Sequence, residues 1–114
     1  MRDIVEYVTS TLSSVGVPVV FQAYPAGATP PSQYVTFLEY HTGPEMEAAD
    51  KELTTERLIQ VNIWSKGNYT QLVNKVRTTL EQAGFERTSE YDGPYTDGDS
   101  HFNKVLRFRY IDEY

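Results

Sequence analysis

The segment that most constrains the fold runs from Leu58 to Phe85 and reads LIQVNIWSKGNYTQLVNKVRTTLEQAGF. Residues 59–63 alternate apolar and polar side chains, which is the pattern of a strand with one buried face. The turn SKGN follows, with Asn68 placed as a helix N-cap, and Gly84 stands where a glycine commonly ends a helix. Between them, apolar residues recur at helical spacing: Tyr69, Leu72, Val73, Val76 and Leu80. The segment therefore predicts a strand, a helix over about 69–83, and a further strand.

The rest of the chain predicts a second helix and a set of strands joined by polar loops. We expect a helix over residues 2–14, strands over 17–24, 34–41, 53–64, 85–90 and 101–111, and loops over 25–33, 43–52 and 91–100. The order α-β-β-β-α-β-β indicates an α+β fold, in which an antiparallel or mixed sheet is flanked by two helices. A length of 114 residues predicts a single domain spanning 1–114.

Composition excludes several classes of function. The chain has no cysteine, so it has no disulfide, thiolate nucleophile or cysteine zinc site, and an intracellular protein is favoured. The net charge is −6 and the ten Lys and Arg are scattered, which disfavours specific nucleic-acid binding. No apolar run is long enough to span a membrane. The nine tyrosines predict broad half-buried sheet faces or a protein–protein surface.

The strongest metal-like pattern is Asp97, Asp99 and His101, with Asp92 nearby. Alternating oxygen ligands can reach one hard cation, but the distal glutamate of a calcium loop is absent and the Asp-Gly pairs are turn formers in their own right. We therefore expect no metal and no cofactor, and we interpret His41 and His101 as surface histidines.

Other polar groups also favour a structural interpretation over a catalytic one. Four acids, Glu45, Glu47, Asp50 and Glu52, could be paired carboxylates, but a flexible loop has nothing to hold their spacing or raise a pKa. A solvated acidic hairpin connection fits them better. Arg107 and Arg109 share a strand face near residues 112–113, which predicts an ion-paired face. No catalytic residue is expected.

Four stretches together carry a family resemblance: PPSQYVTF, TTERLIQVNIWSKGNYTQL, LEQAGF and YDGPYTDGDSHFNKVLRFRYI. With the leading helix, they make nearly the whole chain resemble the small tail-completion or tail-terminator proteins of long-tailed phages and prophages of Gram-positive bacteria. These are also described as minor capsid or head–tail joining proteins.

The resemblance implies a non-enzymatic virion structural protein. Such proteins form a ring, usually a hexamer, that caps the tail tube and docks to the head connector while DNA passes through the lumen. The implied partners are other copies of the chain, the tail tube protein and the head connector protein, without membrane or specific nucleic-acid binding. The implied location is the tail or neck of the virion, and the bacterial cytoplasm during assembly. The resemblance carries over no single site residue, because the function lies in surfaces. From the acidic hairpin and the turn-rich loop of this sequence, the candidate interface residues are Glu45, Glu47, Asp50, Glu52, Tyr91, Tyr95, Asp97 and Asp99.

Two other classes of function stay open. An acidic protein that mimics DNA and blocks a DNA-binding enzyme would present clustered carboxylates on one ordered face. A small metal-dependent hydrolase would use Asp97, Asp99 and His101.

Overall fold

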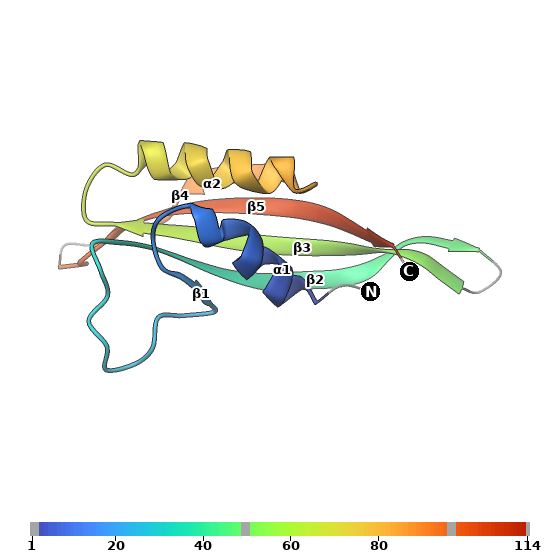
Figure 1. The fold of residues 1–114 in the computed structure, drawn as a ribbon, viewed down its shortest axis with the longest axis horizontal. Helices are drawn as coiled ribbons and strands as arrows, with labels where there is room; N and C mark the ends of the chain where they lie inside the picture. The colour runs from blue at the N-terminus through green and yellow to red at the C-terminus, as the bar shows by residue number, and fades with distance from the viewer. Residues whose placement is uncertain (1–2, 49–50, 96–97, 114) are drawn as a thin grey trace.

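The computed structural model describes residues 3–48, 51–95 and 98–113, and within them two helices and five strands (Figure 1). The elements are α1 (Ile4–Thr11) with a 3₁₀ turn (Leu12–Ser14), β1 (Val19–Phe21), β2 (Gln33–Ala48), β3 (Lys51–Ser65), α2 (Thr70–Gln82), β4 (Glu86–Asp92) and β5 (Phe102–Glu113). The α+β class and the order α-β-β-β-α-β-β are confirmed.

The strands form one mixed sheet in the order β1-β2-β3-β5-β4. The short β1 runs parallel to β2 and pairs with it only over Val35–Phe37, whereas all other neighbouring strands are antiparallel. β5, the last strand in the sequence, lies between β3 and β4. The last strand in the sequence is therefore an interior strand of the sheet, with a neighbour on each side.

The expected loop over 43–52 is wrong, because β2 continues to Ala48 and β3 begins at Lys51. The antiparallel ladder of the preceding strands continues into this acidic segment, with Gly43 opposite Glu56 and Glu47 opposite Glu52. Three register shifts, near residues 40 and 45 and between 46 and 47, accommodate the twist of the long pair. Its charge density suggested a loop, but alternating acids are equally compatible with a ribbon that has solvent on both faces.

This hairpin projects from the rest of the molecule (Figure 1), whose principal extents are 54 × 27 × 24 Å. The pairing of β3 with β5 ends at Thr54 opposite Glu113. Beyond that point β3 pairs only with β2, so the distal part of the hairpin is a two-stranded ribbon.

Both helices pack on one face of the sheet and form a single core with it. Their buried residues are Ile4, Val8 and Leu12 from the first helical segment and Leu72, Val73, Val76 and Leu80 from α2. The α2 residues confirm the predicted stripe, whose first member, Tyr69, is partly buried. The sheet contributes Val35, Phe37, Ile59, Val61, Ile63, Leu106 and Phe108. Because side chains alternate along a strand, the residues between these point away from the helices.

The helix ends follow the expected chemistry, except that α2 begins at Thr70, so its N-cap is Tyr69 and the predicted N-cap, Asn68, lies one residue earlier. The side chain of Asp3 accepts hydrogen bonds from the backbone N–H groups of Val5 and Glu6, and Asn68 Oδ1 accepts one from Thr70 at 2.8 Å. Gly84 has a φ of +99°, and Phe85, only 3% exposed, folds back so that its N–H donates to Leu80 O. No helix among the described residues is long and apolar enough to cross a membrane.

Candidate interaction surfaces

The face of the sheet opposite the helices carries a row of hydrogen-bonded polar side chains, and we call this the outer face. Arg107 Nε donates to Gln60 Oε1 at 3.1 Å, Gln60 Nε2 to Asn62 Oδ1 at 3.0 Å, and Asn62 Nδ2 to Asn103 Oδ1 at 3.2 Å. The row crosses between β5 and β3, so it fixes the orientation of each side chain in it. This is an ordered polar surface.

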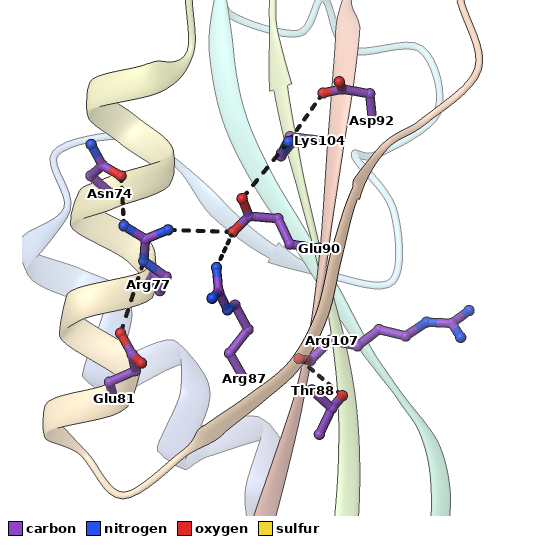
Figure 2. Close-up of polar contacts among 9 residues, drawn as sticks. All are labelled: Asn74, Arg77, Glu81, Arg87, Thr88, Glu90, Asp92, Lys104 and Arg107. Carbon is purple, nitrogen blue, oxygen red and sulfur yellow. Dashed lines mark hydrogen bonds and ion pairs between the residues drawn. The ribbon is translucent and has the colours of Figure 1, made fainter.

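Two tyrosine rings flank the guanidinium of Arg107 on this face. Its Cζ lies 4.9 Å from the ring centre of Tyr40 on β2 and 5.9 Å from that of Tyr91 on β4. These are cation–π distances, and the two tyrosines are 39% and 44% exposed. Figure 2 shows Arg107 pointing away from the side of the sheet that faces α2. We call Tyr40, Arg107 and Tyr91 the arginine clamp.

The ion pairing predicted for Arg107 and Arg109 is wrong in its partners. Arg109 Nε pairs with Glu56 Oε2 of β3 at 2.5 Å, and Asp112 pairs with Arg57. Within the part of the chain that the structure describes, no carboxylate pairs with Arg107. Alternation along β5 places Asp112 on the helix-covered face, opposite to the arginines, which explains the difference.

A second polar cluster lies on the helix side, between α2 and the β4–β5 pair (Figure 2). Glu90 is central to it, at 2.9 Å from Arg87, 3.5 Å from Arg77 and 3.8 Å from Lys104. Such partly exposed ion pairs each contribute little to stability. Through Arg77 the cluster links α2 to Glu90 of β4.

At the edge of that cluster the hydroxyl of Tyr69 donates a hydrogen bond to Asp92. The bond raises the pKa of Tyr69 to about 12 and lowers the pKa of Asp92, which Lys104 also contacts at 3.3 Å. Both shifts stabilise the protonation states present at neutral pH, so neither group is suited to proton transfer.

A buried ion triad lies on the helix-covered face where the body meets the projecting hairpin. Arg57 of β3 donates to both carboxylate oxygens of Glu39 on β2, and its Nη1 lies 3.2 Å from Asp112 Oδ2 on β5. Arg57 and Asp112 are only 7% and 6% exposed. The triad thus joins the three central strands through one guanidinium.

Because of the triad, we expect the free energy of unfolding to fall as the pH becomes acidic. Burial raises the pKa of Glu39, but hydrogen bonds from Arg57 and Thr42 and the charge of Arg57 outweigh burial, so its pKa is lowered in the folded state. A lowered folded-state pKa stabilises the protein above the unfolded-state pKa, and this contribution is lost as the pH falls through the folded-state value. We expect the difference in free energy of unfolding between wild type and Glu39→Gln to be largest at neutral pH and to shrink below about pH 4.5. Urea denaturation of both proteins from pH 3 to 7 measures this, and a constant difference would contradict it.

His101 is buried, at 7% exposure, so its interpretation as a surface histidine is wrong. Its Nε2 lies 2.8 Å from the Pro31 carbonyl, which can only accept, so Nε2 donates and Nδ1 contacts Ser100 Oγ at 2.7 Å. Both ring nitrogens are engaged, so the ring fastens the loop before β2 to the start of β5. A metal cannot take His101 without breaking one of these bonds. Residues 3–48, 51–95 and 98–113 contain no group of three metal-ligating side chains.

The predicted interface residues fall into separate places. Glu45, Glu47 and Glu52 belong to the projecting hairpin, whereas Asp50 and Asp97 lie outside the described residues. The structure does not bring the hairpin together with the loop after β4, because the two lie at opposite ends of the long axis (Figure 1).

The residues predicted for the loop also separate. Tyr91 belongs to β4, opposite Val105, and is part of the arginine clamp. Tyr95 stacks on Phe102 with ring centres 4.5 Å apart. Asp99 lines a pocket of about 300 Å³ beside Trp64 and His101.

Sequence reasoning missed Tyr40 and the role of Arg107. Alternation placed Arg107 on a face opposite Leu106 and Phe108, so its outward direction could be read from the sequence. Its tyrosine neighbours come from β2 and β4, and only the strand order brings these near β5.

No protein-family model matches this chain, and no curated protein matches it significantly.

Proposed function

We propose that this protein is a non-enzymatic structural component of a long-tailed phage or prophage particle, a ring-forming tail terminator or head–tail joining protein. The observation that carries the proposal is the β2–β3 hairpin, which extends beyond the helix-covered body as a two-stranded ribbon. Among the described residues, the distal part of this arm pairs with no third strand, and its projection suits it to reach a neighbour. The resemblance of the sequence to tail-completion proteins supports the same assignment.

A ring requires a heterologous contact, in which one surface of a subunit meets a different surface of the next. The projecting hairpin supplies one such surface. The proposed assembly is a hexamer on the tail tube, and its partners are the tube protein and the head connector. DNA passes through the ring, and the net charge of −6 disfavours its adhesion to the wall. The protein acts in the tail or neck of the virion and in the bacterial cytoplasm during assembly.

The edge of β2 shows how an arm of this kind avoids unspecific pairing. Beyond Phe37, β2 has no second neighbouring strand among the described residues, so its edge is open. Pro44 and the register shifts near residues 40 and 45 interrupt this edge. Proline and bulges are common protections of open edges against aggregation. The arm therefore favours a specific partner over indiscriminate strand addition.

The test is assembly of particles by the phage or prophage that encodes the protein. We expect that deleting residues 45–50, or replacing residues 93–99 with a Gly/Ser linker, gives tails that are irregular in length or not joined to heads. The linker starts after β4, so that the strand pairing of Tyr91 is preserved. A Gly/Ser replacement of the exposed residues 26–29 is the matched control and should leave particles normal. Electron microscopy measures tail length and the fraction of joined heads.

Different outcomes test the two interface assignments and the proposed function. Normal particles in both the hairpin and the linker mutants would refute these two interface assignments. Normal particles after removal of the whole gene would refute the function itself.

A further inference from the structure

We infer that the arginine clamp on the outer face binds carboxylates of the β2–β3 hairpin of a second copy of this chain. The inference rests on the proposed function, because it names the surface on which the projecting arm docks. It is carried by the geometry of Arg107 and by the distribution of charge over the fold.

Arg107 is held in a fixed orientation that leaves its two Nη atoms able to donate hydrogen bonds to a ligand. Gln60 holds Nε, and the rings of Tyr40 and Tyr91 flank the guanidinium. Within the described chain neither Nη atom has a hydrogen-bond partner. A guanidinium presents paired N–H groups that match a carboxylate, and an already ordered side chain loses little conformational entropy on binding. Tyrosine and arginine, with tryptophan, are also the residues enriched among those that dominate binding at protein interfaces.

The distribution of charge indicates which segment binds the arginine clamp. Over residues 43–52 the sequence places Glu45, Glu47, Asp50 and Glu52 against one cation, Lys51. On the outer face Arg109 already pairs with Glu56, whereas Arg107 has no ion-pair partner in the residues that the structure describes. The acidic arm and the clamp are therefore the complementary pair that the chain itself offers.

The arm cannot reach the clamp of its own subunit. Arg107 lies opposite Gln60, which lies opposite Leu38 on β2. Ala48, at the end of β2, is ten residues farther along the same strand, or about 30 Å. The hairpin continues the sheet that carries the clamp and leads away from it (Figure 1), so only a second copy can bring its arm there. Each subunit then offers one arm and one clamp, which is a heterologous contact that can close into a ring.

Photo-cross-linking of the full-length protein tests this contact directly. We would place p-benzoylphenylalanine at Ser89, an exposed residue of β4 directly opposite Arg107. Light and heavy isotope-labelled copies are mixed at high concentration, so that mass spectrometry separates links between copies from links within one. We expect links between copies that map to residues 43–54. Links that map only elsewhere, or none between copies, would overturn the inference.

Charge variants then test the chemistry. Arg107→Glu and Arg107→Gln should lower the yield of these links about ten-fold or more, because each leaves the carboxylates of the arm without their partner. Arg107→Lys keeps the charge but loses the paired N–H geometry and should be intermediate. Combining Arg107→Glu with Glu45→Lys, Glu47→Lys and Glu52→Lys should restore the yield. Lys66→Glu, which makes the same charge change in an exposed turn, is the matched control and should have no effect.

An unchanged yield in Arg107→Glu would overturn the inference. Circular dichroism confirms the fold of each variant. If the Arg107 variants do not fold, the triple Glu→Lys hairpin variant is decisive, since it lies outside the packed body, and it must lose the links. Normal particles from a phage carrying Arg107→Glu, where removal of the gene abolishes joining, would refute the clamp and leave the proposed function standing.

Discussion

Replacing Arg57 with alanine is expected to destabilise the protein by about 3–5 kcal/mol, the loss typical when one partner of a buried ion pair is removed. Arg57 bridges Glu39 and Asp112, and Asp112 is 6% exposed. Without Arg57, the buried carboxylate of Asp112 loses the charge of this guanidinium. Urea denaturation at pH 7 measures the change in free energy of unfolding.

Arg77→Ala is the matched control for this variant. Arg77 also contacts two carboxylates, Glu81 at 3.9 Å and Glu90 at 3.5 Å, but its side chain is 29% exposed. Water can solvate the groups left behind, so a loss of about 1 kcal/mol or less is expected. Equal losses in the two variants would show that burial does not govern the energetics of the triad.

Phe108→Ala should be comparably damaging, with a loss of about 3–5 kcal/mol. Phe108 is fully buried at the centre of the sheet, where it lies opposite Ile59 and packs edge-on against Phe85 with ring centres 6.4 Å apart. Removing the ring leaves a cavity on the helix-covered face of β5 that the surrounding side chains fill only in part. Thermal and urea unfolding both report the loss.

Phe102→Ala provides the control on the same strand and the same face. Phe102 is 42% exposed at the start of β5, where its ring stacks on Tyr95. Its removal should cost well under half of the Phe108 loss, since little apolar area returns to water. A larger loss at Phe102 than at Phe108 would contradict the placement of the core.

The core could be predicted because it depends on local periodicity. The strand at Ile59–Ile63 and the stripe on α2 follow from alternation and from helical spacing, and both are buried as expected. Turn chemistry at Asn68 and Gly84 likewise acts within a few residues. In these segments the residues that determine the structure are neighbours in the sequence.

The features that the sequence predicted wrongly or not at all depend mostly on contacts between residues far apart in the sequence. His101 is buried because Pro31, seventy positions earlier, accepts its N–H. The arginine clamp needs β2 and β4 on either side of the β3–β5 pair, which is a property of strand order. The acidic hairpin was mistaken for a loop because composition reports solvation, and a two-stranded ribbon is solvated as fully as a loop.

The position of β5 also bears on when the molecule can fold during synthesis. β5 follows every other element in the sequence, yet both β3 and β4 pair with it. Until β5 leaves the ribosome, β4 has no neighbouring strand and β3 exposes an edge over most of its length. The buried Phe108 and the Asp112 of the ion triad arrive with the same strand. A growing chain therefore cannot complete the sheet, its core or the ion triad until β5 has been translated, so folding of the whole domain is postponed to the end of its synthesis.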